Sequence, residues 1–244
     1  MLENVGSVGQ KKLLSSRVLI IGAGGLGSPA AVYLAAAGVG TIGLVDSDVL
    51  ELSNLQRQIA HRTTDIGTQK VVSAKNTISA LNPDVKVEMH EIRAKADNIA
   101  PVISRYDFII DAVDNFESKF LINDACWFEK KPYCHGGIIR FDGQIMTIIP
   151  GQTACYRCIF DSSPPPDEAK QCSRDGVLGV LPGIIGTLQA TEALKFLLGI
   201  GELVTDALLT YNSLKAQFRK IPLKRNPNCR LCGKTPQITE LIGE

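Results

Sequence analysis

The chain has 244 residues, a length that suits one large α/β domain with a well-buried core. Its composition, 45% hydrophobic and 21% charged, is that of an ordinary globular protein. The formal net charge of +1 gives no reason to expect binding to nucleic acid or to a membrane through a charged surface. A phosphate-bearing ligand would therefore be held by a few placed cations, and no nucleic-acid or membrane partner is expected.

The longest uncharged run extends from Val18 to Val45 and has the length of a membrane span. Seven glycines and Pro29 interrupt it. The run is better explained by a strand, a helix that begins near Pro29 and ends at Gly38, and a second strand. Since the N-terminus also lacks the basic-then-apolar layout of a signal peptide, we expect a cytoplasmic protein without a membrane span.

The first half of the chain alternates strands with helices. Strands are predicted at 17–21, 41–46, 86–92 and 107–113, and helices near 26–37, 69–81 and 116–129. Strands joined by helices predict right-handed crossovers. The expected fold is therefore α/β and Rossmann-like, with a mostly parallel sheet covered by helices on both faces.

The second half begins after residue 131 and has a different character. Turn residues such as Gly136-Gly137 and Asp142-Gly143 separate short β-like runs, which predicts an antiparallel continuation of the sheet. The segment 161–174, with three consecutive prolines and five charged residues, is predicted to be a surface loop. The remaining predicted elements are a helix at 186–198 and strands near 206–211 and 216–221.

A glycine-rich turn follows the first predicted strand. Gly22, Gly24 and Gly27 have the spacing of a dinucleotide-binding turn, where they permit the tight turn, close approach to phosphate and close helix–strand packing. Amides at the start of the next helix would face the anion. Asp46, about twenty residues further on, could hold ribose hydroxyls. Taken alone, this pattern fits a nicotinamide or flavin oxidoreductase as well as an ATP enzyme, or a turn without a ligand.

Three further features favour a triphosphate. Asn54 and Arg57 lie in a stretch too polar for the core, and Arg57 can grip phosphate oxygens bidentately. Lys70 begins a predicted helix, from which its ammonium could reach the same site. Asp114 and Asn115 follow a buried strand at the carboxyl edge of the sheet, and a carboxylate there suits Mg²⁺. Each could instead be a solvated charge or a helix cap, but two cations and a carboxylate around one glycine turn fit a triphosphate better than a nicotinamide.

The chain has seven cysteines, four of which form two C-x₂-C pairs. Cys155 with Cys158 and Cys229 with Cys232 suit a tetrahedral structural Zn²⁺ site. A redox dithiol and a pair of disulfides are the alternatives. A cytoplasmic chain argues against disulfides, and a redox dithiol needs no second identical pair.

Two of the other cysteines and the histidines are given no part in the chemistry. Cys126, in Asp124-Ala125-Cys126-Trp127, and Cys134, in an apolar strand, are expected to be buried core residues. His61, His90 and His135 show no metal-ligand spacing, and no role is assigned to them.

Taken together, these motifs resemble those of the ThiF/MoeB/HesA family, the bacterial and archaeal relatives of the ubiquitin-activating enzyme. The likeness extends from about Gly9 to Gly233 and rests on the glycine turn, the cysteine pairs, Lys70, Asp114-Asn115 and the motif Asp46-x-Asp48-x-x-Glu51-x-Ser53-Asn54-Leu55-Gln56-Arg57-Gln58. The resemblance implies an ATP-dependent adenylyltransferase that acts as a homodimer, activates a carboxylate as an acyl-adenylate and releases pyrophosphate. The carboxylate it implies is the C-terminal glycine of a ubiquitin-like sulfur-carrier protein of the thiamine or molybdopterin type.

The resemblance also implies site residues. Arg57, Lys70 and Asp114 would be catalytic. Cys172, in the loop 161–174, would either form a covalent intermediate with the carrier or be a non-catalytic thiol. The residues expected to bind ATP or its Mg²⁺ are Gly22, Gly24, Gly25, Gly27, Asp46, Asp48, Ser53, Asn54, Leu55, Gln56, Arg57, Lys70, Asp114 and Asn115.

One departure from the family leaves the substrate open. Family members usually carry an arginine-containing segment before the region matching Gly9-Gln10, whereas Met1 to Ser7 contains no arginine. Arg17, Arg62 or Arg140 could replace it, or the enzyme could act on a small carboxylic acid in cofactor biosynthesis. More remote alternatives are an NAD-dependent oxidoreductase and a non-catalytic nucleotide-binding scaffold. We expect one domain over 1–244, with a nucleotide-binding half at 1–131 and an acceptor-binding and zinc half at 132–244.

Overall fold

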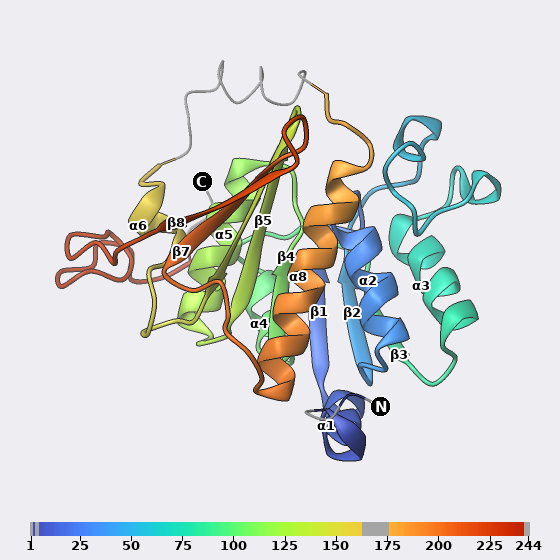
Figure 1. The fold of residues 1–244 in the computed structure, drawn as a ribbon, viewed down its shortest axis with the longest axis horizontal. Helices are drawn as coiled ribbons and strands as arrows, with labels where there is room; N and C mark the ends of the chain where they lie inside the picture. The colour runs from blue at the N-terminus through green and yellow to red at the C-terminus, as the bar shows by residue number, and fades with distance from the viewer. Residues whose placement is uncertain (1, 3–4, 163–175, 242–244) are drawn as a thin grey trace.

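The computed structural model describes residues 2, 5–162 and 176–241. Its centre is one eight-stranded sheet in the order β3-β2-β1-β4-β5-β6-β7-β8 (Figure 1). The strands are β1 Arg17–Ile21, β2 Thr41–Val45, β3 Lys86–His90, β4 Phe108–Asp111, β5 Tyr133–Ile139, β6 Asp142–Ile148, β7 Ala207–Asn212 and β8 Gln217–Pro222.

The strands up to β5 pair in parallel, as the alternation of strands and helices predicts. The central strands β2 and β4 are buried along their whole length, which explains the apolar runs 42–45 and 108–110 within them. The strands from β5 to β8 pair antiparallel, so the predicted change of character after residue 131 is confirmed. Because β5 belongs to both patterns, the same sheet continues from one half into the other.

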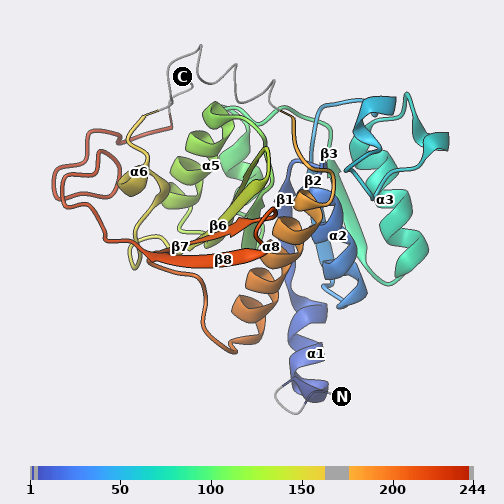
Figure 2. The same ribbon diagram turned by 45° about the horizontal axis from the view of Figure 1, so that its top comes forward.

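Helices cover both faces of the sheet (Figure 2). The side chains of α2, α3 and α8 pack on one face, and those of α4 and α5 pack on the other. Neighbouring residues of β1 alternate between the two cores, with Ile20 in the first and Ile21 in the second. The helices are α1 Gly6–Ser15, α2 Gly27–Ala36, α3 Lys70–Leu81, α4 Ile99–Ile103, α5 Phe116–Phe128, α6 Tyr156–Ile159 and α8 Leu181–Leu198, with 3₁₀ turns η1 Leu52–Asn54 and η2 Thr63–Asp65.

The structure differs from the sequence expectation at four helices, of which the short helices α4 and α6 had no predicted counterpart. The helix expected at 186–198 begins five residues earlier as α8, because Pro182 lies in its first turn, where the missing N–H costs no hydrogen bond. Helix α1 was not predicted, since its sequence Gly6–Ser15 has no regular apolar stripe. In the part of the chain that the structure describes, none of the helices is both long and apolar enough to cross a membrane.

Candidate functional site

A cavity of about 1020 Å³ opens at the carboxyl ends of β1, β2 and β4 and continues over the antiparallel half of the sheet. Parallel strands present their carboxyl ends at one edge, so the loops that leave three strands meet there. The wall includes the glycine turn after β1, the acidic turn after β2, the start of α5 and side chains from β5 to β8. Both halves of the chain therefore contribute to one cavity.

The glycine turn brings the start of α2 very close to β1. Gly22 has a φ of +100°, a conformation that side chains disfavour. A Cβ at Gly27 would lie 1.9 Å from the carbonyl oxygen of Gly22, so only glycine fits there. Gly22, Gly24 and Gly25 line the cavity, whereas Gly27 is not in its wall. The N–H groups of Gly24 and Gly25 have no acceptor within the described ranges and are available to an anion.

Asp46 follows β2 and is held by two backbone N–H groups. Its Oδ2 accepts from the N–H of Ala23 at 2.8 Å, and its Oδ1 accepts from the N–H of Asp48 at 2.8 Å. Burial raises the pKa of Asp46, although the two backbone donors and Lys70 oppose that rise. Each oxygen keeps a further lone pair, so the carboxylate can brace the glycine turn and still accept a hydroxyl from a ligand.

Two cations and a carboxylate meet at this end of the cavity. Lys70 begins α3, its side chain is only 8% exposed, and its Nζ lies 2.7 Å from Oδ2 of Asp48. Arg57 donates from Nη1 to the carbonyl oxygen of Ser53 at 3.2 Å. Lys70, Asp48 and Arg57 all line the cavity wall. The fixed ammonium and guanidinium therefore lie on the same cavity as the free glycine amides, as an anionic ligand would require.

Asp114 and Asn115 lie in the turn between β4 and α5, and both line the cavity. Asn115 caps α5, since its Oδ1 accepts from the N–H of Ser118 at 2.9 Å. Asp114 is exposed to solvent within the cavity wall. An exposed carboxylate is the kind of ligand that fits Mg²⁺, which keeps several waters and takes few protein oxygens.

Besides Gly27, four of the predicted ATP-binding residues lie outside the cavity wall. They belong to η1 or follow it, and they are Ser53, Asn54, Leu55 and Gln56. Asn54 accepts from the N–H of Glu51 through Oδ1 at 3.1 Å, which closes this turn. The Gln56 carbonyl packs so closely against Gly179 that a Cβ there would lie 2.5 Å from its oxygen. Contact of these four with a nucleotide stays a prediction, and in this arrangement they shape the loop that presents Arg57.

A buried charged cluster beneath the cavity was not predicted. Lys119 lies 3.3 Å from Oδ1 of Asp111 and donates to the carbonyl of Gly136 at 2.6 Å, while Nδ1 of His135 lies 2.8 Å from Oδ2 of Asp111. Burial alone would raise the pKa of Asp111, but Lys119 and His135 outweigh it, and this pKa lies below its ordinary value. Lys119 and His135 line the cavity. The sequence offered no signal for this cluster, because its members come from three separate elements.

Gln58 also lines the cavity without having been assigned a role. It ends the polar motif that begins at Asp46, its side chain is buried, and its Oε1 has no hydrogen-bond partner in the described part of the chain. Its Nε2 lies near Gly24, where a Cβ would be 3.6 Å away. A buried acceptor of this kind is available to a donor on a ligand.

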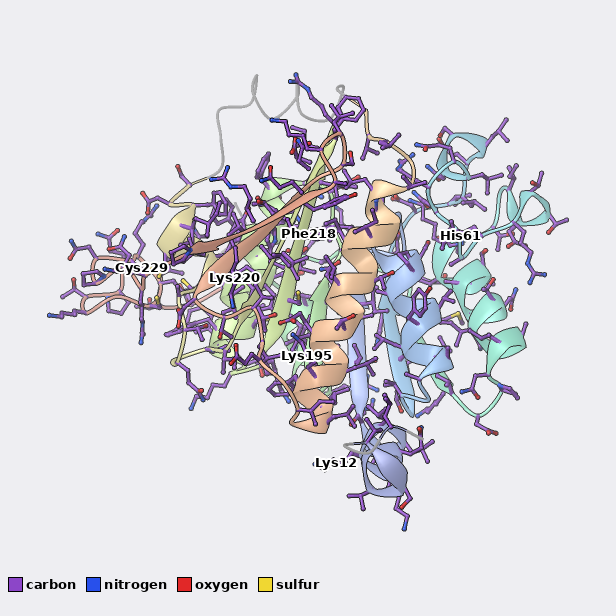
Figure 3. All side chains as sticks on the ribbon, viewed as in Figure 1. Lys12, His61, Lys195, Phe218, Lys220 and Cys229 are labelled. Carbon is purple, nitrogen blue, oxygen red and sulfur yellow. The ribbon has the colours of Figure 1, made fainter. Side chains whose placement is uncertain are left out.

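The two cysteine pairs come together at the far end of the antiparallel half. The sulfur atoms of Cys155, Cys158, Cys229 and Cys232 all lie within 4.8 Å of one another. Cys155 lies 3.6 Å from Cys229, and Cys158 lies 3.3 Å from Cys232. A tetrahedral zinc with Zn–S bonds of about 2.3 Å would place its sulfurs about 3.8 Å apart, so the cluster fits that ion. Figure 3 labels Cys229 at the end of the molecule opposite His61.

The first cysteine pair also contributes to the cavity. Tyr156 follows Cys155 and lines the cavity wall, and its ring packs against His135 with a centroid distance of 4.8 Å. Arg157 makes a buried bidentate ion pair with Asp124 of α5, with contacts of 2.8 Å from both Nε and Nη2. The metal-ligand loop is therefore fixed to α5 on one side and to the cavity on the other.

Several sequence expectations concern residues away from the site. Cys172 and its charged neighbours lie outside the described residues. Cys126 and Cys134 are fully buried as expected, and burial raises the pKa of both thiols well above the ordinary value. Arg17, one possible substitute for the missing arginine, begins β1 at the end away from the cavity and binds Glu88 at 3.0 Å. It therefore does not serve the cavity of its own chain.

Comparison with known proteins shows the family of the chain. The ThiF family model matches residues 1–231. The SAMP-activating enzyme E1 of Haloferax volcanii is 48% identical over 234 residues, which cover 96% of this chain and 86% of that protein. A sulfur carrier protein adenylyltransferase of Thermus thermophilus is 44% identical over 247 residues, covering 99% of this chain and 91% of that protein.

The fold also matches solved structures. The crystal structure of E. coli MccB with ATP superposes with a TM-score of 0.80 at 25% identity, covering 92% of this chain and 68% of that one. A cavity built on a glycine turn, two cations and an exposed carboxylate is what an ATP-dependent adenylyl transfer needs. The chain belongs to the ThiF family of ATP-dependent adenylyltransferases.

Proposed function

We propose that this enzyme adenylates the C-terminal glycine of a ubiquitin-like sulfur-carrier protein. The observation that carries the proposal is the extent of the cavity, which leads from the glycine turn onto the open face of the antiparallel strands. Gly137, Gln144, Thr210 and Arg219 are paired in register across β5, β6, β7 and β8, and all four line the cavity. An extended C-terminal tail could lie along this row with its last carboxylate beside the nucleotide site.

The residues at the two ends of the cavity suit the two reactants. In the reaction, a carboxylate oxygen of the tail attacks the α-phosphorus of ATP, the bond to the bridging oxygen breaks, and pyrophosphate leaves in line. Negative charge on the phosphoryl oxygens would be stabilised by Arg57, Lys70 and the free N–H groups of Gly24 and Gly25. Positioning of the two reactants would supply most of the remaining acceleration.

The metal sites form part of the same proposal. Asp114 would hold a Mg²⁺ ion, which supplies charge neutralisation to the phosphates of bound ATP. The four clustered cysteines would hold one structural Zn²⁺ ion, and their spacing supports this. We further propose a cytoplasmic homodimer. A covalent intermediate at Cys172 remains part of the hypothesis for transfer of the activated carrier.

The relatives support a protein substrate. The Thermus thermophilus relative is named for a sulfur carrier protein, and the chain covers most of that relative's length. A small carboxylic acid is the alternative, and it would leave the outer part of the row at Thr210 and Arg219 without a contact. The two substrates are therefore distinguished by the antiparallel half and share the nucleotide half.

Pyrophosphate exchange tests the proposal directly. The purified chain is incubated with ATP, Mg²⁺ and labelled pyrophosphate, and each reaction receives either one carrier protein ending in Gly-Gly or one small acid from the same cell. Exchange that requires a carrier, and is lost when its last glycine is deleted, is the expected result. Exchange supported by a small acid alone identifies the alternative substrate class, and absence of exchange with every carboxylate identifies a scaffold.

A further inference from the structure

Ala23 lies in the middle of the glycine turn, and both its backbone N–H and its carbonyl oxygen make hydrogen bonds to side chains. Its N–H donates to Oδ2 of Asp46 at 2.8 Å, and its carbonyl oxygen lies 2.9 Å from Nε2 of His61. His61 is buried and comes from the loop after Gln58, which Figure 3 shows above α3. A carbonyl oxygen can only accept, so Nε2 of His61 carries a proton in this contact.

The contact with His61 fixes the direction of the next N–H. The carbonyl of Ala23 and the N–H of Gly24 belong to one peptide group, which is trans, since the described residues contain no cis peptide bond. In a trans peptide the carbonyl and the N–H point in opposite directions. With the carbonyl directed at His61, the N–H of Gly24 is directed away from it. This N–H has no acceptor within the described residues, and Gly24 lines the cavity.

His61 is itself held from the other side. Its Nδ1 lies 2.9 Å from Oγ of Ser73 on α3, and that hydroxyl lies 2.6 Å from Oδ2 of Asp65 on η2. When both ring nitrogens carry a proton, Nε2 donates to Ala23, Nδ1 donates to Ser73, and the Ser73 hydroxyl donates to Asp65. In the neutral ring, Ser73 donates either to Nδ1 or to Asp65, and the bond from Nε2 to Ala23 persists.

The surroundings of His61 shift its pKa in both directions. Burial lowers the pKa of His61 and Lys70 adds to that effect, while the Ala23 carbonyl, Asp46 and Asp65 raise it, and the net direction is downward. The neutral ring with its proton on Nε2 is thus sufficient for the contact with Ala23 near neutral pH. Only a hydrogen-bond donor at the place of Nε2 is needed, whatever the charge of the ring.

We propose that His61 is a positioning residue that orients the Ala23–Gly24 peptide so that the Gly24 N–H faces a phosphate of the bound nucleotide. Asp46 holds the same residue from its N–H side, and Ser73 with Asp65 holds the ring. This inference rests on the proposed function only in taking ATP as the ligand, and it requires no particular carboxylate. It assigns a role to a histidine that has no metal-ligand spacing and lies behind the cavity wall.

Two conservative variants separate positioning from packing. His61→Gln retains an N–H donor near the place of Nε2, whereas His61→Asn retains one only near the place of Nδ1. The dissociation constant of ATP with Mg²⁺ is measured by calorimetry for both variants and the wild type, and that of adenosine, which has no phosphate, is measured in parallel. Melting temperatures are recorded for all three proteins.

We expect His61→Gln to bind ATP within about 3-fold of the wild type and His61→Asn to bind it about 10–100-fold more weakly, the loss expected for one hydrogen bond to a charged group. Adenosine should bind all three proteins equally. In pyrophosphate exchange, KM for ATP should rise in His61→Asn with a smaller change in kcat. The inference is overturned if the two variants bind ATP equally, or if His61→Asn weakens adenosine as much as ATP. If the wild type binds ATP but exchanges pyrophosphate with no carboxylate, the proposed substrate fails while the role of His61 stands.

Discussion

The two halves of the sheet position their functional groups by different means. In the parallel half, side chains that lie far apart in the sequence meet because strand ends meet, and hydrogen bonds such as those to Ala23 fix the backbone. In the antiparallel half, two short cysteine loops meet at one point, where a single ion could hold them together. The cavity at the parallel half therefore depends on contacts between separate parts of the fold, whereas the proposed metal site at the far end depends on four thiols.

Removal of one thiol from the four-cysteine cluster should give the largest effect, the loss of the bound metal ion. Cys229→Ser is expected to reduce bound zinc from about one equivalent per chain to none, because a three-thiolate site loses much of its affinity. The region around Cys229 should then become sensitive to protease, while ATP binding at the other end is retained. Elemental analysis and limited proteolysis measure the two outcomes. Cys126→Ala, which also removes a buried thiol, should keep its metal.

Removal of Lys70 or Arg57 from the cavity should lower the rate of adenylation and leave the zinc content unchanged. Lys70→Ala and Arg57→Ala are each expected to lower the rate of pyrophosphate exchange by roughly 10²–10³-fold, the usual cost of removing one group that stabilises transition-state charge. Lys75→Ala, in the same helix α3 but outside the cavity wall, is the control. An unchanged exchange rate in Lys70→Ala and Arg57→Ala would contradict the assignment of both residues.

The smallest effect concerns acid stability in the parallel half. The side chain of Lys86, together with Arg17 and Tyr106, holds the pKa of Glu88 at about 2, below its ordinary value of 4.5. Because the folded pKa is depressed, this stabilisation is present above pH 4.5 and is lost as the pH falls towards 2. Glu88→Gln should cost about 1 kcal/mol near neutral pH and flatten the acid limb of the stability curve.

Chemical denaturation of Glu88→Gln at a series of pH values measures this effect. Glu91→Gln, which replaces an exposed neighbouring carboxylate, is the matched control and should follow the wild type. Identical acid limbs in the two variants would show that the contacts of Glu88 contribute nothing to stability.

The sequence predicted those features that are encoded locally. The strand at 17–21 was predicted correctly because an apolar run ends at a glycine turn, and the two cysteine pairs could be recognised from their spacing. The direction of the strands after β5 followed from turn residues. In contrast, the contact between His61 and Ala23 and the cluster of Asp111, Lys119 and His135 each join separate segments. No spacing rule applies to such contacts, so only the folded chain reveals them.

The packing of α8 against α2 has a consequence for synthesis of the protein. A Cβ at Gly186 would lie 2.2 Å from the carbonyl of Leu26, so the two helices touch at the backbone although most of the chain separates them (Figure 1). A ribosome adds roughly 5–20 residues per second. About 8–32 s therefore pass between the synthesis of Ala36, the last residue of α2, and that of Leu198, the last residue of α8. Until Leu198 has left the ribosome, the face of α2 that packs on α8 stays exposed, and exposed apolar surface of this kind is prone to aggregation.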